Sequence, residues 1–161
     1  MKIHRLNTKT VALEEIDPFL AGLLREIPAR ADPGQSPAVR ERLFPKPTAG
    51  GEPEADAEWV ELVEPELHEL FVDALGVVDE DLQDFPDPPD AEGMTLRLPV
   101  KHLEAWIHAL NQARLALVAR HGFTEREIER EFSFEGGERA DILFRIQFYG
   151  VLQELFLRQL E

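Results

Sequence analysis

The chain has 161 residues, a formal net charge of −15 and no cysteine. This length fits a single domain, and 43% hydrophobic residues are enough to fill a core, so the chain is not a disordered acidic tail. The missing cysteine excludes disulfides, thiolate metal sites and cysteine nucleophiles, and the negative charge argues against nucleic acid or an anionic membrane as a ligand of the acidic surface.

An N-terminal hairpin is the first predicted element. Residues 2–6 alternate apolar and polar side chains, and the apolar residues 11–13 follow after a polar turn. Residues 94–98 alternate in the same way, which is typical of a strand. Because a two-stranded ribbon alone is only marginally stable, we expect residues 94–98 to pair with the hairpin.

Two helices are predicted next, each opened by a capping residue and a proline. Asp17 precedes Pro18, and Ser36 precedes Pro37, which is the order of residues at a helix start. Pro28 is expected to end the first of these helices, and the residues up to the second helix then form a connector.

The acidic residues are concentrated in one block. Residues 47–96 contain sixteen of the 32 Asp and Glu residues and no Lys or Arg. Apolar side chains at helical spacing predict helices over residues 54–82, with a break or a kink at Pro65. Residues 84–93 are rich in proline and acid, and we expect them to form a mobile loop.

The last third of the chain predicts two long helices. Residues 99–121 carry apolar side chains on one face, and Gly122 is a typical helix end. Residues 139–160 are apolar around most of the circumference, which indicates the central helix of a bundle or half of a dimer seam. The predicted fold is therefore mainly α, a helical bundle of four to six helices with a small β element.

Motifs for catalysis or metal binding are missing from the sequence. There is no Gly-x-Ser-x-Gly and no glycine-rich phosphate loop followed by Lys and Ser or Thr. Two Glu-x-x-x-His spacings, Glu64/His68 and Glu104/His108, lie outside the apolar stripes and are expected at the surface. We therefore expect no catalytic residue, no metal site and no cofactor, and an enzyme is the less favoured interpretation.

Polar residues on apolar helix faces form the candidate site for a ligand or partner. A buried guanidinium without a partner costs several kcal/mol, so we expect Arg114 and Arg145 each to meet a carboxylate from the acidic block or another subunit. Internal ion pairs that fix the helix register are the preferred interpretation, and a polar pocket for a ligand or partner peptide is the alternative. The candidate residues are Asn111, Arg114, His121, Arg145 and Gln153.

Four groups of short motifs follow one another within residues 38–160. They are Arg42-Leu-Phe-Pro45; Ala57-Glu-Trp-x-x-Leu-x-Glu64; Leu110-Asn-x-x-Arg-Leu-x-Leu117 with Arg120-x-Gly-x-Thr-Glu125; and Tyr149-x-x-Leu-Gln-Glu-x-x-Leu157. In these motifs the chain resembles the bacterial family catalogued as domain of unknown function 2017. It departs from the family pattern near its start and in the acidic loop at 84–93.

The resemblance implies no catalytic residue, because the family has no established activity. In actinobacteria the genes of this family often lie beside that of the Clp protease adaptor, which implies a regulatory or protein-quality-control role. The resemblance therefore adds a cellular process to the hypotheses and no mechanism.

We expect a single-domain, soluble, cytoplasmic protein that acts through protein–protein contacts. No apolar run resembles a secretory signal or reaches the roughly 20 residues that span a membrane. The acidic face is expected to bind a basic partner protein, and part of the last helix to form a homodimer. A small-ligand-binding protein or enzyme with a pocket around Asn111 and Arg114 is the alternative, and a mimic of nucleic-acid charge ranks below both.

Overall fold

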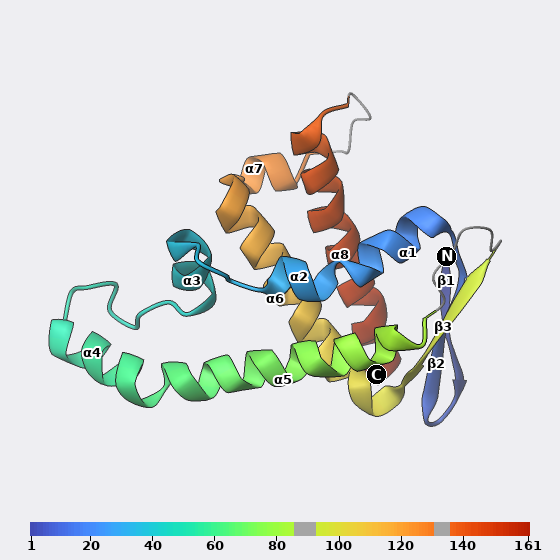
Figure 1. Cartoon of the computed structure of the whole chain (residues 1–161), viewed down its shortest axis with the longest axis horizontal. Coiled ribbons are helices and arrows are strands. Elements are labelled where there is room, and N and C mark those ends of the chain that lie inside the picture. Colours follow the sequence, from blue (N-terminus) through green and yellow to red (C-terminus); the bar gives the residue numbers. More distant parts are fainter. Residues whose placement is uncertain (86–92, 131–135) are drawn as a thin grey trace.

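The computed structural model describes residues 1–85, 93–130 and 136–161. These residues form eight α-helices, one 3₁₀-helix and one small sheet (Figure 1), which confirms a mainly α fold with a small β element. Most of the acidic loop predicted at 84–93 lies outside the described residues. In chain order the elements are β1 (Lys2–Asn7), β2 (Thr10–Ile16), α1 (Pro18–Arg25), α2 (Ile27–Ala31), α3 (Pro37–Leu43), α4 (Pro53–Leu62), α5 (Glu64–Gln83), β3 (Met94–Pro99), η1 (Val100–His102), α6 (Leu103–His121), α7 (Glu125–Ile128) and α8 (Glu138–Leu160).

The sheet lies at one end of the molecule and has the strand order β1-β2-β3 (Figure 1). Both pairings are antiparallel, and Leu13 of β2 faces Leu96 of β3 in the register. The side chains of Leu13, Leu96 and Leu98 are buried, as expected for the apolar positions of alternating strands. The predicted pairing of residues 94–98 with the hairpin is confirmed.

Both predicted helix starts are confirmed by their capping bonds. The Leu20 amide donates to Asp17 Oδ1 at 2.8 Å, and the Val39 amide donates to Ser36 Oγ at 3.4 Å. The prediction that Pro28 ends a helix is wrong, because Pro28 lies in the first turn of α2. A first-turn residue has no intrahelical acceptor for its N–H, so proline costs nothing there. Part of the expected connector is therefore a helix.

The centre of the helical body is α6, which contacts α2, α3, α5 and α8. The interpretation of the last helix as the central one is wrong, because α8 buries one face and leaves Val151 and Leu157 exposed. Apolar residues lie around most of α8, but only one face of the helix packs against the rest of the described structure. The fully buried residues of α6 are Leu103, Trp106, Ala109, Leu110, Ala113, Ala116 and Leu117.

A helical arm projects from this body. The predicted break near Pro65 is confirmed, since α4 ends at Leu62 and α5 begins at Glu64. Figure 1 shows α4 and the first half of α5 extending away from the other helices. The arm is braced by Phe44, whose ring centroid lies 5.3 Å from that of Phe71 on α5. Residues 53–73 are called the acidic arm below.

Candidate functional site

Arg145 has the internal carboxylate partner that the sequence led us to expect. Its Nε lies 2.9 Å from Oε2 of Glu26, and its Nη2 lies 3.3 Å from Oε1 of the same residue. Arg30 shares this carboxylate, with Nε at 3.1 Å from Oε2. Burial raises the pKa of Glu26, but the hydrogen bonds and charges of Arg145 and Arg30 outweigh it, so the pKa lies below its usual value. The acid comes from the end of α1 and not from the acidic block.

Arg114 has no carboxylate partner among the described residues, so the internal ion pair that was expected for it is not found there. Among the described residues its guanidinium makes one hydrogen bond, from Nη1 to Oε1 of Gln153 at 2.9 Å. Its Nε is buried without an acceptor. The guanidinium lies against α8 at Gly150, where an added Cβ would be 3.2 Å from Arg114 Cζ. A neutral amide thus stands where a carboxylate was predicted.

Asn111 and Arg114 line a cavity of about 480 Å³ bounded by α3, α6, α7 and α8. Arg42 and Glu125 are the other two charged residues of its lining, and the remaining lining residues are apolar. Gln153 adjoins the cavity indirectly, because it holds the Arg114 guanidinium through its amide oxygen. The structure therefore brings three of the five candidate residues together.

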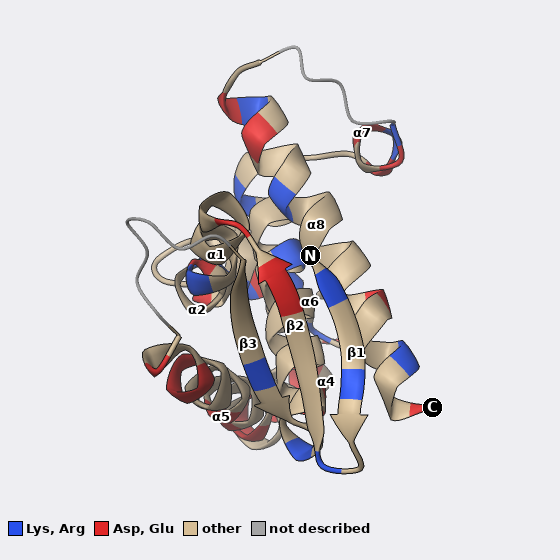
Figure 2. Ribbon diagram, turned by 90° about the vertical axis from the view of Figure 1, so that its right-hand side faces the viewer, with Lys and Arg blue, Asp and Glu red and all other residues tan. Residues whose placement is uncertain are grey.

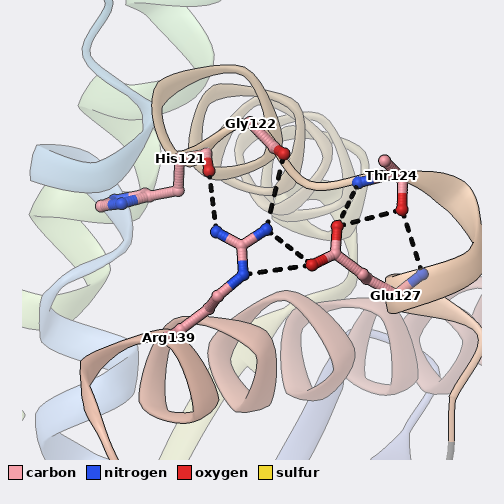
Figure 3. A network of polar contacts seen from close by, with 5 residues as sticks. All are labelled: His121, Gly122, Thr124, Glu127 and Arg139. Carbon is pink, nitrogen blue, oxygen red and sulfur yellow. Dashed lines mark hydrogen bonds and ion pairs between the residues drawn. The ribbon is translucent and has the colours of Figure 1, made fainter.

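His121 and Arg145 do not join this group. The carbonyl oxygen of His121 accepts a hydrogen bond from Arg139. The His121 side chain points away from this polar network (Figure 3). Burial, followed by the charge of Arg120, lowers the pKa of His121. Arg145 is engaged by Glu26, and it is not among the residues that line the cavity.

The network in Figure 3 joins α6, α7 and α8. Arg139 Nη2 lies 2.7 Å from Oε1 of Glu127, and its Nη1 donates to the His121 carbonyl at 3.0 Å. Thr124 and Glu127 form a capping box at the start of α7. The Thr124 amide, Arg139 and the Thr124 hydroxyl lower the pKa of Glu127 to about 2. This network holds α7 at the edge of the cavity, and its arginine is fully engaged.

The sequence reasoning missed a polar cluster between α5 and α6. Asp81 Oδ2 accepts from the indole Nε1 of buried Trp106 at 2.8 Å, and Oδ1 lies 2.9 Å from Nδ1 of His102. A carboxylate only accepts, so Nδ1 carries the proton. The only signal in the sequence was that a buried tryptophan needs an acceptor for its N–H. The cluster fastens the end of α5 to the start of α6.

Asp56 is a second missed residue, and it organises the loop before the acidic arm. Its carboxylate accepts from the Thr48 amide at 3.0 Å, the Thr48 hydroxyl at 2.8 Å and the Gly50 amide at 2.6 Å. Burial raises the pKa of Asp56, but these hydrogen bonds outweigh it and leave the pKa below its usual value. One acid of the block is therefore structural and not part of a binding face.

The acidic arm carries exposed acid and exposed apolar side chains together. Its one ion pair among the described residues joins Glu64 to Arg40 at 3.5 Å. Figure 2 shows acidic residues and no basic ones along α5. The exposed carboxylates without a basic partner in the described part of the chain are Glu54, Glu58, Glu61, Glu66, Glu69 and Asp73. The exposed apolar side chains are Val60, Leu62, Val63, Leu70 and Val72.

Residues 4–160 match the family described as "Domain of unknown function (DUF2017)". The chain belongs to the DUF2017 family. The match begins before the four motifs and includes the hairpin, so the N-terminal strands are part of the DUF2017 region and not an addition to it. A search of the curated proteins found no match, and a search of the solved structures found none.

The described residues of this DUF2017 protein contain no group of three or more His, Asp or Glu side chains placed to hold a metal ion. His68, from one of the two Glu-x-x-x-His spacings, has its ring 5.7 Å from that of Phe44. Across the described ranges, none of the helices combines the length and apolar character needed to cross a membrane. The candidate sites in this DUF2017 protein are therefore the acidic arm and the cavity beside Arg114.

Proposed function

We propose that this protein is a non-catalytic interaction module whose acidic arm binds a partner protein. The partner presents basic side chains around an apolar patch. One observation supports this proposal above all others: exposed apolar side chains and unpaired carboxylates are interleaved on a helical segment that projects from the body. Leu70 and Leu62 are 64% and 59% exposed in the middle of this field of negative charge.

Solubility alone does not explain the arm. Acidic side chains keep a protein soluble, but exposed leucines and valines among them act against that effect. Glu66, Leu70 and Asp73 are spaced by four and three residues, which places them on one helix face. An apolar centre with a charged rim is the usual composition of a protein interface. The charge steers a basic partner to the arm, and the apolar side chains hold it there.

The cellular setting is part of the same proposal. A reducing cytoplasm fits a chain without cysteine. The regulatory or protein-quality-control role that the family resemblance implies fits a module that binds another protein and carries no catalytic set. A small-ligand-binding protein or an enzyme is the alternative, and it depends on the cavity at Arg114 instead of the arm.

Self-association through α8 is a secondary feature of the proposal. Val151, Leu157 and Leu160 of α8 are exposed, and Phe19 of α1 lies beside the same helix with its ring 5.6 Å from that of Phe144. A homodimer would cover these side chains. This face lacks the concentrated charge of the arm, so its association should respond little to salt.

The proposal is tested by capturing partners from a lysate of the source organism at about 0.1 M and 0.5 M salt. The wild type is compared with the triple variant Glu66→Lys, Glu69→Lys and Asp73→Lys. A matched control reverses three exposed acids outside the arm, Glu104, Glu129 and Glu154.

We expect a stoichiometric partner that is retained by the wild type and the control at low salt, and that is lost from the arm variant and at high salt. A partner that the arm variant retains as well as the control does would contradict the proposal. Recovery of no partner at either salt would also contradict it and would favour the ligand-binding alternative.

A further inference from the structure

We propose that the cavity between α3, α6, α7 and α8 is a binding site for a small organic carboxylate with an apolar chain, and that Arg114 receives the carboxylate. This site is separate from the proposed acidic-arm interface. The inference begins with the unusual state of Arg114 compared with the other partly buried arginines.

Two of the other three partly buried arginines in the described part of the chain meet a carboxylate, and the third combines a carbonyl with an aromatic ring. Arg30 and Arg145 share the carboxylate of Glu26. Arg25 donates to the Phe85 carbonyl and lies over its ring. Arg114 has one neutral acceptor, the amide oxygen of Gln153, although a guanidinium offers five N–H donors. A partly buried cation with most of its donors unused is suited to receive an anion.

The packing around Arg114 keeps the guanidinium in place without neutralising it. Gln153 accepts from Nη1 and donates its own amide to the Ile107 carbonyl at 3.4 Å, which fixes its orientation. Gly150 leaves the space that the guanidinium occupies against α8. The positive group is thus positioned before any ligand arrives, which reduces the entropy cost of binding.

The rest of the cavity indicates the chemistry of the ligand. Arg42 adds a second positive charge at the lining, and Asn111 adds an amide, whereas Glu125 is the one acid there. The walls are apolar, with buried Phe123 and Ile146 among them. Two arginines against one glutamate favour a single negative charge on the ligand, and the apolar walls favour a hydrocarbon chain.

The volume agrees with a small molecule. The cavity measures about 480 Å³, within the range of about 300–1,000 Å³ for small-molecule sites. The global charge of −15 would attract cations and repel anions. A preference for an anion over a cation of the same size would therefore come from the local arginines and not from the overall field.

The test is a titration of the full chain with three probes of equal chain length: octanoate, octan-1-ol and octylammonium. Binding is followed by backbone amide NMR shifts of Asn111, Leu115 and Phe123. We expect saturable shifts with octanoate only. Arg114→Gln should weaken octanoate binding about 10- to 100-fold, as expected for loss of a charge-assisted hydrogen bond.

Two further variants keep the test decisive if Arg114→Gln does not fold. Arg42→Gln changes an exposed residue of the lining and should weaken octanoate binding severalfold without unfolding the protein. Arg158→Gln changes an exposed arginine on α8 outside the cavity lining and should leave the affinity unchanged. The proposal would be overturned by equal binding of octanoate and octan-1-ol, or by wild-type octanoate affinity in Arg42→Gln. It would also be overturned if octanoate did not bind at all.

Discussion

Glu26 shows how a single residue can join three helices. It stands at the end of α1 and accepts from Arg30 of α2 and Arg145 of α8. The sequence predicted that Arg145 would need a carboxylate, because it lies among apolar positions. It did not identify Glu26, which is 119 positions away in the chain. Nothing local distinguishes this glutamate from the other acids, so its role depends on tertiary packing.

Removing Arg145 should destabilise the fold. Arg145→Met leaves Glu26 with one cationic partner, so we expect the free energy of unfolding to fall by about 1–2 kcal/mol. The measurement is urea unfolding of the variant and the wild type. Arg158→Met, at an exposed position of the same helix, is the matched control and should change the stability by less than about 0.5 kcal/mol. An Arg145 variant as stable as this control would show that the ion pair contributes nothing.

Glu127 gives a pH prediction. The pKa of its carboxyl is lowered from 4.5 to about 2 by the Thr124 amide, Arg139 and the Thr124 hydroxyl. Because the folded-state pKa is the lower one, ionised Glu127 stabilises the fold above about pH 4.5, and this contribution is lost as the pH falls to about 2. We expect the melting temperature of wild type to exceed that of Glu127→Gln at neutral pH.

The difference between the two melting temperatures should shrink between about pH 4.5 and pH 2. Comparing differences removes the common effect of the many other carboxylates. A difference that stays constant over this range would mean that the charge of Glu127 does not stabilise the corner between α6, α7 and α8.

At the level of elements, local signals predicted helix starts better than helix roles. The caps at Asp17 and Ser36 form as expected, because a capping bond involves only neighbouring residues. The alternatives for the last helix, the centre of the bundle or half of a dimer seam, could not be separated locally, because an apolar circumference does not reveal which face finds a neighbour. Pro28 was misread for a related reason, since a proline fits the first turn of a new helix as well as the end of an old one.

The acidic arm should contribute little to the core through its exposed apolar residues. Leu70→Ser is expected to change the free energy of unfolding by less than about 0.5 kcal/mol. Val78→Ala, at a fully buried position of the same helix, should cost about 2 kcal/mol. Thermal and urea unfolding of both variants measure this contrast. A Leu70→Ser variant as unstable as Val78→Ala would assign Leu70 to the fold and remove it from the proposed interface.

At the scale of the whole molecule, charge and shape have different origins. The charge of the arm could be read from residues 47–96, because composition alone gives it. The projection of α4 and half of α5 from the body (Figure 1) could not, because it depends on which helices pack against each stretch of α5. A pocket around Asn111 and Arg114 was the alternative interpretation of the sequence. The presence of Arg42 in its lining could not be predicted, because it depends on how the fold brings α3 and α6 together.

The most direct test of partner binding by the acidic arm is photo-crosslinking in cells of the source organism. A photoreactive residue replaces Leu70 in one variant and Val151 in the other, since both are exposed apolar side chains, at 64% and 56%. We predict that position 70 gives an adduct with a different protein, one with a basic surface, and that position 151 gives an adduct with a second copy of the chain. Adducts to another protein from position 151 and none from position 70 would contradict the proposal that the acidic arm is the partner-binding surface.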